Sequence, residues 1–170
     1  MVSKRTPASV VALGGVLAAL AVVVMALGGT IPVATYVCPV VDMLLLQVVL
    51  KTCGERIAWA WYGAVVILVL LLSPDKEAAA IFAFLGYYPI LKPKLDRTGA
   101  PWLWKGLLFN GVILLMYWLL LNLFGMAQLA AEFQGMGIAM TVVTLILGNA
   151  TFFLMDRVLS GRPGRRKHGK

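Results

Sequence analysis

Long apolar stretches separated by short polar ones dominate the hydrophobic pattern of this chain. Crossing the roughly 30 Å hydrocarbon core of a bilayer takes about 20 apolar residues in a helix. Six stretches approach that length: Ala8 to Leu27, Pro32 to Leu50, Ile57 to Leu72, Pro74 to Leu91, Trp102 to Phe124 and Met136 to Leu154. The pattern therefore predicts an all-α fold, a polytopic membrane bundle of six transmembrane helices.

Two local signals refine the fourth of these segments. Ser73 followed by Pro74 is typical of a helix start, with serine as N-cap and proline at the first helical position. Asp75 and Glu77 then favour the positive end of the helix dipole. Further along, the run from Gly86 to Pro89 predicts a kink or a break, because proline lacks the backbone N–H that a helix uses.

Composition supports a membrane location. Hydrophobic residues make up 61% of the 170-residue chain and charged residues 13%, against about 45–50% and about 25% in soluble domains. No linker-like segment interrupts the pattern. We expect one six-helix transmembrane domain over residues 1–160, followed by a basic cytoplasmic tail over residues 161–170.

The basic residues set the expected orientation, because Lys and Arg are retained on the cytoplasmic side. Fourteen of the fifteen lie on alternate connections and only Lys76 lies on the other side. Both termini are therefore expected in the cytoplasm. Trp59, Trp61 and Tyr62, and also Trp102 and Trp104, lie near the inner ends of helices and are expected to anchor them at the interface. The net charge of +8 does not form a stripe with interleaved aromatic residues, so no nucleic-acid partner is expected.

Asp42 is the ionisable residue that lies deepest in an apolar segment. It follows Pro32 by ten residues, which places it about 15 Å into the bilayer. A charged side chain there costs on the order of 2.5 to 3.5 kcal/mol on insertion scales, so Asp42 should face the bundle interior. Two roles stay open: contact with a substrate or proton, or a structural carboxyl that ties helices together.

Other polar side chains lie at a similar depth and are candidates for one polar layer with Asp42. Structural hydrogen bonding between helices is the favoured interpretation, since membrane bundles use amides in this way. The candidates are Gln47, Tyr87, Tyr88, Asn110 and Asn149.

Several enzyme classes lack their residues in this sequence. The single histidine, His168, lies in the basic tail, so a histidine-ligated metal site is not expected. A Walker A loop is also missing, and any ATP-driven process would need another subunit. We expect a protein that is not an enzyme and that has no cofactor and no metal.

Small residues repeat at four-residue spacing in the first helix, where they allow a second helix to approach closely. Packing within the bundle is the favoured interpretation of these pairs, and a partner protein using the same surface is the alternative. With six helices, cytoplasmic termini and this small-residue helix, the whole chain resembles the substrate-binding S-components of energy-coupling factor transporters. The resemblance implies a bacterial inner-membrane protein that docks on a transmembrane coupling subunit with its ATPases. The docking positions would be Ala8, Ala12, Gly15 and Ala19.

S-components generally bind a small solute such as a vitamin near the outer face. The resemblance therefore implies a pocket drawn from polar residues on that face: Tyr36, Asp75, Lys76, Glu77, Asn122, Glu132 and Gln134. Asp42, Asn110 and Asn149 lie deeper than such a pocket reaches. The segment SPDKEAAAIFAFLGYYPILK is also similar to a group of uncharacterised bacterial membrane proteins, a likeness that assigns no activity.

The expected function is that of a substrate-binding membrane subunit of a multi-component importer, whose partners are the bilayer, the solute and the coupling module. Two alternatives remain. One is a structural membrane protein of a cell-envelope complex, in which polar residues serve packing only. The other is a self-contained channel or proton-coupled transporter that uses Asp42.

Overall fold

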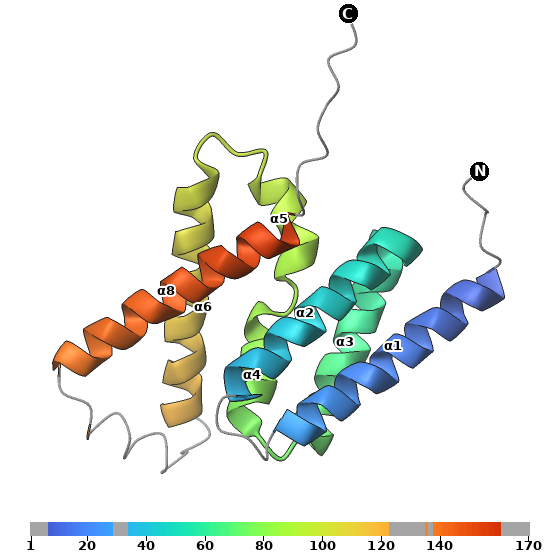
Figure 1. Ribbon diagram of the computed structural model, residues 1–170, viewed down its shortest axis with the longest axis horizontal. Helices are drawn as coiled ribbons and strands as arrows, with labels where there is room; N and C mark the ends of the chain where they lie inside the picture. Colours follow the sequence, from blue (N-terminus) through green and yellow to red (C-terminus); the bar gives the residue numbers. More distant parts are fainter. Residues whose placement is uncertain (1–6, 29–33, 123–134, 136–137, 161–170) are drawn as a thin grey trace, which may run out of the picture. The chain divides into compact units, whose positions relative to one another are not determined.

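The computed structural model describes residues 7–28, 34–122, 135 and 138–160, and the regular secondary structure within them is helical (Figure 1). The helices are α1 (Pro7–Gly28), α2 (Ala34–Cys53), α3 (Glu55–Leu72), α4 (Lys76–Leu85), α5 (Tyr88–Leu95), α6 (Pro101–Asn122) and α8 (Ile138–Leu159). The expected all-α class is confirmed for this part of the chain.

Four of these helices, α1, α2, α3 and α6, are long and apolar enough to cross a membrane. Their most apolar windows have a mean hydropathy between 1.6 and 2.8, and they contain most of the first, second, third and fifth predicted segments. The sixth predicted segment is helical from Ile138 onward, within α8, while residues 136–137 lie outside the described part.

Contacts between residues divide the chain into two compact units, residues 1–117 and residues 118–170. The boundary falls inside the continuous helix α6, so no linker separates them. In the first unit α2 is the central element and packs against α1, α3, α4 and α5. The second unit contains the end of α6 and α8, in which the Ser160 hydroxyl donates to the Asp156 carbonyl at 2.7 Å.

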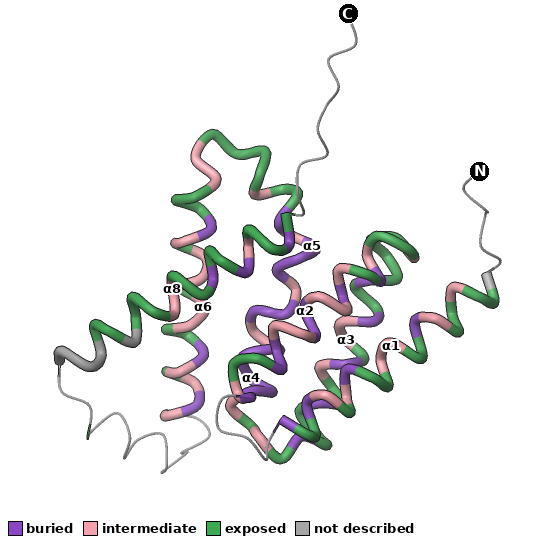
Figure 2. Tube along the Cα trace, in the orientation of Figure 1, coloured by how far each residue is buried: buried purple, intermediate pink, exposed green. Residues whose placement is uncertain are grey.

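The core of the first unit lies between α2 and its neighbours. Leu46 and Val49 of α2 are fully buried with Val65 of α3 and Phe82 of α4. Figure 2 shows that burial is densest along the short helices α4 and α5. Alanines at positions 78, 79 and 80 allow this close packing, since each is less than 5% exposed.

The fourth predicted segment is broken where the sequence indicates it. Helix α4 ends at Leu85, and α5 begins at Tyr88 and continues to Leu95. The Gly86 N–H donates to the Phe82 carbonyl at 2.7 Å, and a Cβ at Gly86 would lie 2.8 Å from the Phe82 ring. Glycine thus allows the turn to lie directly against that ring.

The predicted N-cap of this segment was wrong. Ser73 ends α3 with extended backbone angles, and its N–H donates to the Val69 carbonyl. The side chain that caps α4 is Asp75, which accepts a hydrogen bond from the Ala78 N–H at 3.0 Å. The Asp75 carboxylate thus accepts from one N–H in the first turn of α4. The Ser73 hydroxyl donates instead to the Met25 carbonyl at 3.3 Å and joins α3 to α1.

Two glycines are required by the connections of the first unit. A Cβ at Gly28 would lie 2.6 Å from the sulfur of Cys38, so the end of α1 and the start of α2 meet without room for a side chain. Gly54 joins α2 to α3 with φ +91°, a conformation that L residues with a side chain rarely adopt.

Candidate functional site

Polar side chains gather at the end of the first unit where α1 and α3 end and α2 and α4 begin. Asp75 uses both carboxylate oxygens there: Oδ1 accepts from the Ala78 N–H at 3.0 Å and Oδ2 accepts from the Thr35 hydroxyl at 2.7 Å. The helix cap of α4 is thereby tied to the first turn of α2.

Glu77 makes a second connection, from the first turn of α4. Its Oε1 accepts from the Tyr117 hydroxyl at 2.7 Å and from the Tyr36 hydroxyl at 3.4 Å. These bonds join α2, α4 and α6 around one carboxylate. We call Thr35, Tyr36, Asp75, Glu77 and Tyr117 the Glu77 cluster.

The Glu77 cluster combines accessibility with fixed geometry. The side chain of Tyr36 is exposed, while Glu77 and Tyr117 are half-buried. Carboxylates accept hydrogen bonds, and hydroxyls both donate and accept. The cluster therefore presents acceptors and adaptable donors, held by three helices, at one end of the unit. That is the chemistry with which a protein orients a small polar solute.

The structure brings together three of the seven predicted pocket residues, Tyr36, Asp75 and Glu77. Lys76 points elsewhere, because its ammonium donates to the Leu70 carbonyl at 2.9 Å, at the end of α3. The amide of Asn122 donates to the Trp118 carbonyl within its own helix, in the second unit. Glu132 and Gln134 lie outside the described residues.

Sequence reasoning missed Thr35 and Tyr117. Thr35 precedes a predicted pocket residue in the first turn of α2, where hydroxyl side chains often contact neighbouring helix ends. Tyr117 lies inside an apolar run and resembles a core aromatic. One signal in the sequence could have identified it. Tyr117 lies five residues before Asn122, a predicted pocket residue, and therefore near the same outer end of the predicted helix.

Asp42 is fully buried on the inner face of α2, and neither of its carboxyl oxygens has a hydrogen-bond partner among the described residues. The interior location agrees with expectation. Two predicted members of a shared polar layer bond within their own helices: Asn110 donates to the Gly106 carbonyl at 2.8 Å and Asn149 to the Leu145 carbonyl at 2.9 Å. None of these bonds reaches Asp42, which is therefore a separate feature of the interior. Gln47 is half-buried five residues further along α2.

Aromatic rings join α3 to the break between α4 and α5. Tyr87 stacks on Trp59 with centroids 6.4 Å apart and meets Tyr62 edge-on at 6.1 Å. The Tyr62 hydroxyl donates to the Ala83 carbonyl. Tyr88, the other predicted tyrosine, is completely buried. These rings fix the position of the broken segment.

Trp61 does not act as the interfacial anchor that its place in the sequence suggested. Its side chain is 6% exposed, and Nε1 donates to the Gly14 carbonyl of α1 at 3.0 Å. The indole therefore packs between helices, since a buried N–H requires a partner. Trp59, by contrast, is 40% exposed.

The small-residue positions of α1 lie on two faces. Gly14, Ala21 and Gly28 are buried within the unit. The predicted docking positions are all exposed, and a Cβ at Gly15 would meet no atom within 4 Å. They are Ala8, Ala12, Gly15 and Ala19.

Within the described ranges, no three His, Cys, Asp or Glu side chains are arranged to hold a metal ion. Cys38 and Cys53 are free thiols, at the two ends of α2. Comparison of the chain with models of protein families, with curated proteins and with solved structures finds no match. These comparisons assign no family, so the site itself is the basis for a proposed function.

Proposed function

We propose that this protein is a membrane subunit that captures a small polar solute and passes it to a multi-component importer of the energy-coupling factor type. The Glu77 cluster is the observation that carries the proposal. Residues of three helices bring two carboxylates and three hydroxyls together at one end of the first unit. Polar groups of this kind, held together at the end of a helix bundle, suit recognition of a solute.

The location of the cluster agrees with capture from outside. It surrounds the start of α4, and the connection there carries Lys76, the one basic residue that the charge pattern assigns to the outer side. A solute arriving from outside meets Tyr36 first, since this ring is 54% exposed. Glu77 lies behind it as the charged acceptor.

The exposed face of α1 supports a partner subunit. Gly15 and Ala19 lie one turn apart on that face, and their small side chains allow another helix to approach closely. In this proposal a transmembrane coupling subunit, which works with ATPases, docks there.

The proposed topology has six spans with both termini in the cytoplasm of a bacterial inner membrane. Helices α4 and α5 form the fourth crossing together, since ten and eight helical residues rise about 27 Å at 1.5 Å each. The break between them is enclosed by protein, with Gly86 and Tyr88 buried, which is where a membrane tolerates irregular backbone. Single-cysteine labelling tests this in a Cys38→Ser, Cys53→Ser background. A reagent that cannot cross the membrane should label Lys76→Cys in whole cells and leave Arg97→Cys unlabelled, and the reverse pattern would refute the orientation.

The function is tested by solute binding and by partner capture. Purified protein, freed of copurified ligand, should show a thermal shift with one compound of a vitamin and metal library, and should copurify with an ATPase module when expressed with its natural partners. Gly15→Leu should abolish copurification and leave the thermal shift intact. Gly63→Leu is the matched control, because a Cβ at Gly63 also meets nothing within 4 Å. Absence of both solute binding and a module would end the proposal.

A second candidate function rests on Asp42. A fully buried carboxyl without a hydrogen-bond partner is costly to keep in a membrane domain and often marks a proton pathway. The candidate is a self-contained proton-coupled transporter. It predicts flux in proteoliposomes of the isolated protein that Asp42→Asn abolishes, whereas the importer subunit shows no flux without partners.

A further inference from the structure

An apolar groove lies at the other end of the first unit, between the end of α5 and one side of α6. It has a volume of about 360 Å³ and is lined by Leu95, Trp104, Leu107, Leu108, Gly111 and Val112. From Trp104 to Val112 the groove follows α6 for about 12 Å at 1.5 Å per residue. In the proposed topology α6 crosses the bilayer, so the groove runs in the direction of a lipid acyl chain.

Basic side chains border the mouth of this groove. Lys105 precedes Leu108 by three residues and Val112 by seven, a spacing that puts all three on one face of α6. Its ammonium pairs with Oδ1 of Asp96, the residue after Leu95. One end of the groove therefore lies at an ion pair that joins its two walls, with Lys105 on α6 and Asp96 directly after α5.

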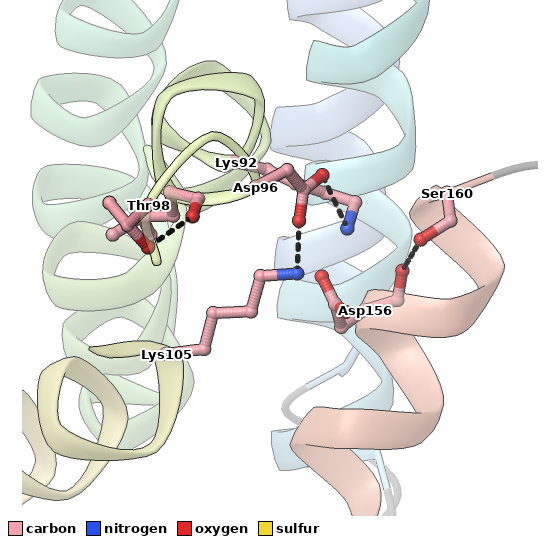
Figure 3. Close-up of polar contacts among 7 residues, drawn as sticks. Lys92, Asp96, Thr98, Lys105, Asp156 and Ser160 are labelled. Carbon is pink, nitrogen blue, oxygen red and sulfur yellow. Dashed lines mark hydrogen bonds and ion pairs between the residues drawn. The ribbon is translucent and has the colours of Figure 1, made fainter. Parts of the chain in front are cut away.

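The ion pair belongs to a larger charged group (Figure 3). Asp96 also accepts from the Lys92 ammonium at 3.3 Å, and Lys92 and Lys105 are 6% and 5% exposed. Lys94 pairs with Glu55 at 2.8 Å, and Arg97 is exposed beside them. Between residues 92 and 105 the chain carries four basic residues and one acidic residue, so this end of the unit attracts anions.

Trp102 and Trp104 complete the surroundings. Their side chains are 69% and 51% exposed, although indoles are among the largest apolar groups a chain can bury. Exposed tryptophans are typical of the level at which lipid headgroups meet acyl chains. The apolar groove thus matches the acyl chain of a lipid, the tryptophans match the level between chain and headgroup, and the basic residues match an anionic headgroup.

We propose that this groove binds an anionic glycerophospholipid of the inner leaflet. One acyl chain lies along α6 over Gly111, and the headgroup phosphate lies at the basic mouth near Arg97. The site rests on the proposed membrane location and is independent of solute capture, because it lies at the opposite end of the unit from Glu77. Charge complementarity selects the lipid, at about fivefold in affinity for each basic residue near the surface, the equivalent of about 1 kcal/mol.

Two substitutions test the site without disturbing the fold. A Cβ at Gly111 meets no atom within 4 Å, so Gly111→Leu can place a larger apolar side chain in the groove. Gly63→Leu on α3 is its control. Arg97→Gln removes an exposed charge at the mouth, and Arg56→Gln, exposed at the start of α3, removes the same charge elsewhere on the same membrane side.

Native mass spectrometry of protein exchanged into mixed phosphatidylglycerol and phosphatidylcholine measures the retained lipid. Wild type, Gly63→Leu and Arg56→Gln should retain phosphatidylglycerol over phosphatidylcholine by at least fivefold. Gly111→Leu should lose bound lipid of both kinds, and Arg97→Gln should lower the preference about fivefold. Equal retention of the two lipids by wild type, or unchanged retention by Gly111→Leu with a native circular dichroism spectrum, would overturn the proposal. Either result would leave solute capture at the Glu77 cluster untouched.

Discussion

The hydrogen bond between Thr35 and Asp75 should stabilise the contact between α2 and α4 by an amount that mutagenesis can measure. Asp75→Ala removes two interactions at once, the cap bond from the Ala78 N–H and the bond from the Thr35 hydroxyl. Thr35→Val removes only the second and keeps the volume of the side chain. The double variant should therefore lose no more than Asp75→Ala alone.

The magnitudes follow from the type of bond. Loss of an N-cap costs about 1 kcal/mol, and a hydrogen bond to a charged group contributes about 1.5 to 3 kcal/mol. Asp75→Ala should lower the free energy of unfolding by about 2.5 to 4 kcal/mol and Thr35→Val by about 1.5 to 3 kcal/mol. The coupling energy between the two sites should equal the Thr35→Val effect.

Reversible unfolding in mixed micelles, followed by far-ultraviolet circular dichroism, measures all four proteins of this cycle. Lys76→Ala is a suitable control at the same helix start, because its exposed ammonium bonds to the end of α3 and not to the cluster. Additive effects, with a coupling energy below about 0.5 kcal/mol, would refute a direct bond between α2 and α4.

Three further substitutions test other parts of the first unit in the same unfolding assay. Asp42→Leu should raise the free energy of unfolding by about 1 to 3 kcal/mol, because it removes a buried carboxyl that has no hydrogen-bond partner; a lower stability would reveal a bond that this carboxyl makes. Gly28→Val should lower the free energy of unfolding by about 1 to 3 kcal/mol, since its Cβ would lie 2.6 Å from the Cys38 sulfur. Adding Cys38→Ala should restore part of this loss, and a double variant no more stable than Gly28→Val would contradict a clash with Cys38. Trp61→Phe should cost about 0.5 to 1.5 kcal/mol through the lost bond to Gly14, and an unchanged midpoint would contradict that contact.

Helix positions were predictable because membrane helices depend on apolar length, which the sequence displays directly. The break after Leu85 was also predictable, since glycine and proline act locally. The N-cap was not, because Ser73 and Asp75 both satisfy the local rule. The choice between them depends on α1, whose Met25 carbonyl accepts the bond from the Ser73 hydroxyl.

Prediction of the candidate site from the sequence was likewise limited to residues with local signals. Asp75 and Glu77 were identifiable as polar residues at a helix start, and Tyr36 as one at the expected outer face. Tyr117 was not, because the distance along the chain to Glu77 is forty residues and only packing brings them to 2.7 Å. Trp61 was assigned to the interface by its place in the sequence, yet helix rotation turns it toward α1.

The central claim is that Glu77 and its neighbours capture a solute, and mass spectrometry of small molecules that copurify with the protein tests it most directly. Wild type and Lys76→Gln should retain the same solute, while Glu77→Gln and Tyr117→Phe should each lose most of it and keep their helical content. Retention of one solute equally by all four proteins, or of none by wild type purified from its native membrane, would contradict the claim.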